Sequence, residues 1–106
     1  MPEATRDLLH RQQRAAKVLG QLLGRAVNEK LPAISWAIAG SPSRPALAGN
    51  CDADDAADRR RDFEAWRDAL AAGVLPEEVD AEGRTRLRAS VTDTYEDITI
   101  ELVAHL

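Results

Sequence analysis

The stretches T-R-L-R-A-S-V (residues 85–91) and I-T-I-E-L-V-A-H (residues 98–105), joined through the turn D-T-Y-E, decide the fold. In both stretches apolar side chains recur at every second position, which is the pattern of a strand with one buried face. Pairing Val91 with Ile98 brings the apolar positions of the two stretches together on one face. We therefore predict an antiparallel hairpin over residues 84–105.

A second hairpin is predicted earlier in the chain, over residues 33–51. Its first arm, A-I-S-W-A-I-A, again alternates large and small residues, and the turn-rich stretch G-S-P-S-R-P follows it. A register that pairs Ile38 with Leu47 places Trp36 opposite Gly49. An aromatic ring then covers the bare glycine, which favours this register.

Two helices complete the pattern. The first is predicted over residues 6–29, with Thr5 as a possible N-cap and Pro32 just beyond its end. The second is predicted over residues 55–73, because it starts in an aspartate-rich stretch where the helix dipole favours acidic side chains.

These elements predict a single α+β domain over residues 1–106. In the order α-β-β-α-β-β, they give an antiparallel four-stranded sheet with two helices packed on one face. The chain has 106 residues, of which 44% are hydrophobic and 30% charged, values typical of one globular domain.

Composition also limits the cellular setting that we expect. A single cysteine, Cys51, excludes an internal disulfide and any site that needs several thiolates. The uncharged stretch of residues 31–43 contains two prolines and is too short to cross a membrane, and residues 1–7 lack the pattern of a signal peptide. We expect a cytoplasmic protein that does not bind membranes.

The aspartate-rich run invites comparison with a calcium loop. Asn50, Asp52 and Asp54 match loop positions 1, 3 and 5. Position 6, which requires glycine, is Asp55, and position 12, which requires glutamate, is Arg61. An acidic helix start explains the run better, so we expect no metal and no cofactor.

Catalytic residues do not assemble from the pattern either. The possible participants are Cys51, His10 and His105, and the predicted register turns Cys51 inward and His105 outward. Since no nucleophile lies near a base, we expect no enzymatic activity.

Basic side chains on two elements offer possible contacts to phosphate groups. They are Arg14, Lys17 and Arg25 on the first helix and Arg84, Arg86 and Arg88 on the third strand. Residues 1–30 carry six basic and three acidic side chains, but the whole chain has a net charge of −4. Nucleic-acid domains are usually strongly basic, and the predicted register also pairs Arg88 with Glu101. Nucleic acid is therefore possible but not favoured.

The first helix instead predicts self-association. Its apolar residues cover almost half of its circumference, whereas packing on a sheet needs a stripe of only about 100°. The edge of this sector adjoins two glycines four residues apart, which make the helix surface flat. The predicted self-association surface comprises Leu9, Ala16, Gly20, Gly24 and Val27. We expect a homodimer, because monomers rarely expose such strips.

Several strings resemble a type of small uncharacterised actinobacterial α+β protein. They are L-P-A-I-S-W-A-I, L-A-G, F-E-A-W, G-R-T-R-L-R-A and I-T-I-E-L-V-A-H-L, within residues 31–106. The resemblance implies the host and a compact α+β domain, and it implies no activity.

The sequence therefore favours a non-enzymatic cytoplasmic interaction protein that self-associates. The alternative is a small nucleic-acid-associated regulator that uses the basic face of the first helix or the arginine strand. A second alternative is a ligand-binding or enzymatic domain with its site in a cleft beside Trp36.

Overall fold

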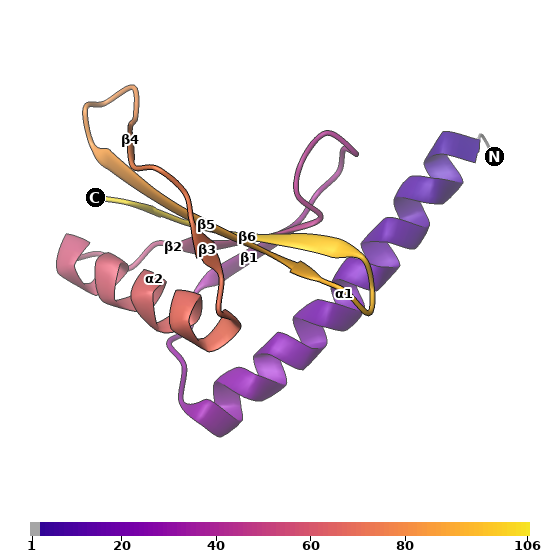
Figure 1. Cartoon of the computed structure of the whole chain (residues 1–106), viewed down its shortest axis with the longest axis horizontal. Helices are drawn as coiled ribbons and strands as arrows, with labels where there is room; N and C mark the ends of the chain where they lie inside the picture. The colour runs from indigo at the N-terminus through magenta and orange to yellow at the C-terminus, as the bar shows by residue number, and fades with distance from the viewer. Residues whose placement is uncertain (1–2) are drawn as a thin grey trace.

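The computed structural model describes residues 3–106, which form two helices and a six-stranded sheet (Figure 1). The elements are α1 Glu3–Glu29, β1 Ser35–Ile38, β2 Leu47–Cys51, α2 Ala56–Leu70, β3 Gly73–Val74, β4 Glu78–Val79, β5 Thr85–Asp93 and β6 Ile98–His105. The α+β class predicted from the sequence is confirmed. The count of four strands is wrong, because the short strands β3 and β4 pair with β5 and extend the sheet.

The sheet is mixed rather than antiparallel. Its strand order is β1-β2-β6-β5-β3, with β4 also paired to β5. The two predicted hairpins meet where β2 lies beside β6, and there the strands run parallel, with Leu47 opposite Ile100 and Cys51 opposite Ala104. Parallel neighbours need a long crossover. Here the segment from α2 to β5 provides it.

The hairpin of β5 and β6 has the predicted faces but not the predicted register. Val91 pairs with Ile100 instead of Ile98, and Asp93 pairs with Ile98. The strands thus run two residues further before the turn, in which Asp97 adopts a left-handed φ of 54°. Because side chains alternate with period 2, a shift of two residues leaves every side chain on its predicted face.

The first hairpin has the predicted register. Trp36 lies opposite Gly49, and Ile38 lies opposite Leu47. A Cβ atom added to Gly49 would lie 2.8 Å from Cζ3 of Trp36 and 2.9 Å from Cδ1 of Ile34. Trp36 also makes an edge-to-face contact with Trp66 of α2, with the ring centroids 5.2 Å apart. The glycine therefore leaves the space that the Trp36 ring occupies, which a side chain at position 49 would fill.

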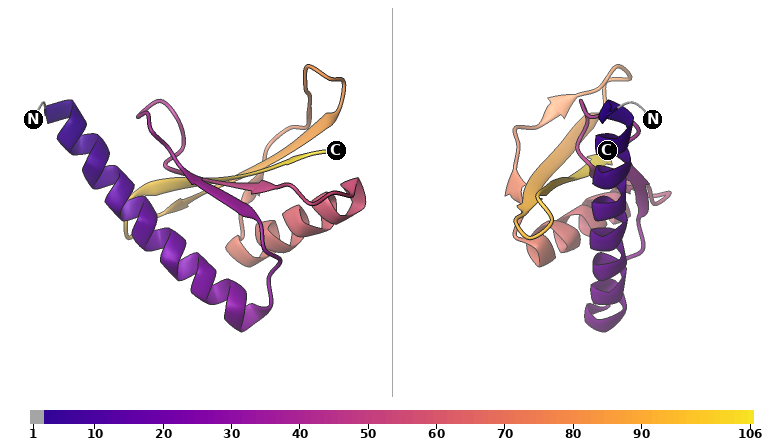
Figure 2. Two further views of the ribbon diagram at one scale, coloured as in Figure 1. Left: turned by 180° about the vertical axis from the view of Figure 1, so that it is seen from behind. Right: turned by 90° about the vertical axis from the view of Figure 1, so that its right-hand side faces the viewer.

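One face of the sheet forms the core beneath both helices. Its buried strand residues are Leu47, Cys51, Leu87, Ala89, Ile98, Ile100, Leu102 and Ala104. They pack in one cluster with Phe63 and Trp66 of α2 and with Ala15, Val18 and Leu22 of α1. The C-terminal ends of the two helices lie near each other, and the helix axes diverge from there toward their N-terminal ends (Figure 2).

The helix ends differ from the predicted ones in two places. Helix α1 already includes Thr5, so the predicted N-cap at that residue is wrong. Helix α2 begins as predicted, since the Asp55 carboxylate accepts a hydrogen bond from the Ala57 backbone N–H. It stops at Leu70 because Ala71 turns into the left-handed region, which frees the chain from Gly73 onward for β3.

Candidate functional site: the outer face of helix α1

Helix α1 is attached to the rest of the domain along a narrow stripe. It has 27 residues and is therefore about 40 Å long. Its buried residues are Ala15, Val18 and Leu22. Side-chain hydrogen bonds to backbone carbonyl oxygens hold both halves of the helix to the rest of the domain. Arg11 donates hydrogen bonds to the carbonyl oxygens of Ser41 and Arg44, Gln12 donates to that of Ala39, and Arg25 donates to that of Ala69.

The opposite face of α1 is exposed and apolar. All five residues predicted for self-association are exposed: Leu9, Ala16, Gly20, Gly24 and Val27. Val27 has 81% of its surface exposed, and Leu9 has 43%. A Cβ atom added to either glycine would meet no atom within 4 Å. The structure thus brings the predicted residues together on one open surface.

Leu23 also belongs to this surface, although it is not among the five residues predicted for self-association. It is 49% exposed. If Leu23 and the exposed Gln13 are added and Gly24 is left out, the positions follow the alternating four-three spacing of a coiled-coil heptad. We call these six residues the α1 seam: Leu9, Gln13, Ala16, Gly20, Leu23 and Val27. The 3.5-residue period was the signal in the sequence that could have identified Leu23.

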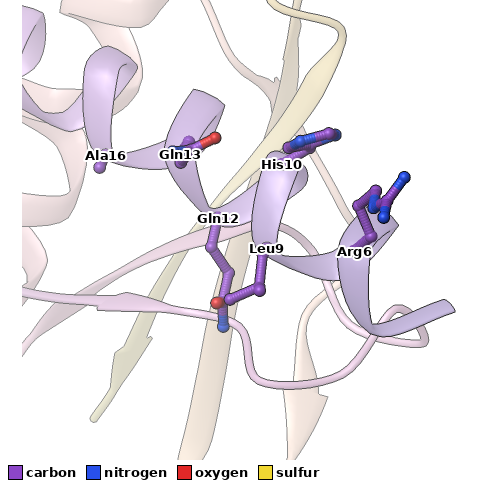
Figure 3. Close-up of a pocket in the computed structure, with 6 residues that line it drawn as sticks. All are labelled: Arg6, Leu9, His10, Gln12, Gln13 and Ala16. Atoms are coloured by element: carbon purple, nitrogen blue, oxygen red, sulfur yellow. The ribbon is translucent and has the colours of Figure 1, made fainter. Parts of the chain in front are cut away.

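A shallow cavity of about 480 Å³ lies at the N-terminal end of the seam. Figure 3 shows that Leu9 and Gln12 extend together from one side of the helix, whereas His10 points away from them. Ala16 lies further along the helix, and its short side chain projects little from the helix surface. The N-terminal half of the seam is therefore an open surface with one projecting leucine.

An apolar cavity of about 400 Å³ adjoins the C-terminal end of the seam. It is lined by apolar residues that include Leu23, Ala26, Val27, Leu31, Ile34 and Trp36. We call it the Trp36 cavity. Trp66 forms part of its wall and donates a hydrogen bond from Nε1 to the Pro32 carbonyl oxygen at 2.8 Å. A cleft beside Trp36 was the predicted location of a ligand site.

Most of the candidate phosphate-binding residues are engaged within the chain. On α1, Arg25 pairs with Glu29 at 2.7 Å and Lys17 pairs with Glu96 at 2.7 Å, while Arg14 is exposed. These contacts raise the pKa of Arg25 and of Lys17, mainly through hydrogen bonds to the partner carboxylates.

The arginines of β5 also face carboxylates. Arg86 and Arg88 both pair with Glu78 of β4, and Arg84 lies 3.5 Å from Asp80. The predicted pairing of Arg88 with Glu101 is wrong, because the two-residue shift places Arg88 opposite Val103. The hydrogen bond from Arg86, with the charge of both guanidiniums, lowers the pKa of Glu78.

Two of the possible catalytic residues, Cys51 and His105, border one small cavity of about 200 Å³, whereas His10 lies apart from them on α1. Cys51 is buried, and this burial raises the pKa of its thiol to about 12, which disfavours the thiolate. His105 lies on the outer sheet face, with Nδ1 3.0 Å from Asp80, and His10 is on α1. Within residues 3–106, no three His, Cys, Asp or Glu side chains converge as a metal site.

The chain was compared with protein-family models, with curated proteins and with solved structures. No family model matches the chain, and no curated protein or solved structure matches it. Across the described residues, no helix has both the length and the apolar character needed to cross a bilayer.

Proposed function

We propose that the protein is a non-enzymatic interaction protein that forms a homodimer by antiparallel pairing of two α1 seams. The symmetry of the seam carries this proposal. Its positions lie at equal distances on either side of residue 18, so that 9 corresponds to 27, 13 to 23 and 16 to 20. A two-fold interface requires that residue i contacts residue j and that j contacts i. An antiparallel helix pair centred at residue 18 meets this condition along the whole seam.

Side-chain sizes along the seam support the same arrangement. Ala16 would pack against the partner's Gly20 at the centre, and Leu9 would pack against the partner's Val27 at each end. Two crossing helices approach most closely at their centre, where small residues are required, and they diverge toward their ends, where large residues fill the gap. The heptad spacing corresponds to a crossing angle of about +20°.

The available area is of the right order for a dimer. The outer half of a helix about 40 Å long and about 10 Å wide presents roughly 600 Å². Standard protein interfaces bury about 800 Å² on each partner. The walls of the two adjoining cavities add to the helix surface, so a moderate, reversible dimer is expected.

The other contacts favour an interaction role over the alternatives. Five of the six candidate phosphate-binding residues pair with carboxylates of the same chain, and a nucleic acid would have to compete with these ion pairs. Burial of Cys51 disfavours its use as a nucleophile. The cytoplasmic location and the actinobacterial origin stay predictions from the sequence.

Light scattering coupled to size exclusion tests the proposed function. At micromolar concentration we expect a mass of about 23 kDa, twice the 11.6 kDa of one chain, falling on dilution as the dimer dissociates. A mass that stays at 11.6 kDa at the highest soluble concentration would contradict self-association.

A further inference from the structure

The Trp36 cavity and the α1 seam share two residues. Leu23 and Val27 are seam positions, and both also line the cavity. The remaining wall comes from the connection after α1, which includes Leu31 and Ile34, and from Trp36 of β1. Trp36 is half-buried. A molecule that covers the C-terminal end of the seam therefore also reaches the cavity.

The chemistry of the cavity indicates an apolar side chain as its occupant. Small-molecule sites combine apolar walls with a few polar groups that orient the ligand. The residues that line the Trp36 cavity are apolar, and the indole N–H of Trp66 is already bonded to Pro32. Burial of an apolar side chain against such a surface is favourable, but the surface offers few hydrogen-bonding groups that could select a polar ligand.

We infer that the Trp36 cavity is the acceptor for the partner's Leu9 in the homodimer. This inference rests on the proposed function. In the antiparallel pair, the partner's Leu9 lies opposite Val27, at the rim of the cavity. Along a straight helix a heptad seam drifts by about 20° per heptad. Toward the C-terminus of α1 this drift is toward Ala26, which lines the cavity. A partner helix that follows the seam therefore covers the mouth of the cavity.

Burial of the cavity would make Trp36 a reporter of dimer formation. Trp66 has 1% of its surface exposed, so a quencher in solution reaches mainly the half-buried Trp36. When the partner's Leu9 enters the cavity, Trp36 loses its contact with solvent. Each dimer contains two such contacts, one at each end of the helix pair, because the interface is two-fold.

Acrylamide quenching of tryptophan fluorescence, recorded with the mass over a dilution series, tests the inference. We expect quenching to decrease as the mass rises to that of a dimer. Leu9→Ala should weaken the dimer and leave Trp36 quenchable in whatever dimer remains, whereas Val79→Ala, which alters an exposed residue of β4, should change neither signal.

The outcomes separate this inference from the proposed function. A dimer that forms without protecting Trp36 overturns the inference and leaves self-association intact. A Leu9→Ala dimer that protects Trp36 as well as the wild-type dimer also overturns it, because another group then fills the cavity. Failure of the wild-type chain to dimerise overturns the proposed function, and this inference with it.

Discussion

Replacing Ile100 by alanine is expected to lower the free energy of unfolding by about 2–5 kcal/mol. Ile100 is 4% exposed and lies in the middle of the sheet, between Leu47 of β2 and Val91 of β5. It belongs to the buried cluster that also contains Val18 and Leu22 of α1. The substitution removes three carbon atoms from this junction, and the rigid strands on both sides prevent the cavity from closing. Urea denaturation followed by circular dichroism measures the loss.

An exposed strand residue provides the control for Ile100. Val79 of β4 is 72% exposed, and Val79→Ala should change the stability by no more than about 0.5 kcal/mol. A loss below about 1 kcal/mol for Ile100→Ala would show that the side chain is not enclosed between the sheet and α1.

Replacing Gly20 by glutamate is expected to weaken the dimer at least about 100-fold, which corresponds to about 2.7 kcal/mol. In the antiparallel pair, Gly20 and the partner's Gly20 are four residues apart along the helix axis, or about 6 Å. The substitution would place two negative charges near each other at the centre of the interface and would also fill the space that the partner's Ala16 needs. Sedimentation velocity over a range of concentrations measures the change.

Two substitutions in α1 are matched to Gly20→Glu. Gln21→Glu adds the same charge one residue away, outside the seam, and should leave the dimer intact. Gly20→Ala keeps the seam low and should preserve association while raising helix stability by about 1 kcal/mol. Gly20 lies in open space, so Gly20→Glu should fold normally. If Gly20→Glu dimerises like the wild type, the interface lies elsewhere.

The faces of the strands were predictable from the sequence because side-chain alternation is a local property. Ile100 and Leu102 are buried as the period-2 pattern predicts, and the pairing of Trp36 with Gly49 followed from the fit between ring and glycine. The alternation of side chains did not determine the register of the hairpin of β5 and β6. It depends on the turn, where the Asp93 carboxylate accepts a hydrogen bond from the Glu96 N–H.

Long-range pairing was not predictable from local patterns. The parallel contact of β2 with β6 joins segments that lie about fifty residues apart, and no pattern within either strand specifies that neighbour. Strands β3 and β4 contain two residues each, which is too short for any periodicity to show. Both are held in place by β5, whose long edge accepts them.

The candidate site was predictable in outline. The excess apolar surface of the first helix indicated an unpartnered face, and its five predicted residues are exposed together. Leu23 was not among them, although on the helical wheel it lies next to Ala16. The structure exposes it because the buried stripe of α1, which holds Ala15, Val18 and Leu22, is narrower than the apolar sector of the helix.

The most direct test of antiparallel α1 pairing is disulfide cross-linking of the double variant Leu9→Cys, Val27→Cys. Mild oxidation should convert it to a covalent dimer of about 23 kDa on a non-reducing gel, because positions 9 and 27 of opposite chains face each other within reach of a disulfide. The native Cys51 is buried with a raised thiol pKa and should stay unreactive. Leu9→Cys alone should give no covalent dimer, since the two copies of position 9 lie about 27 Å apart. Efficient cross-linking of Leu9→Cys alone, or none in the double variant, would contradict the antiparallel seam.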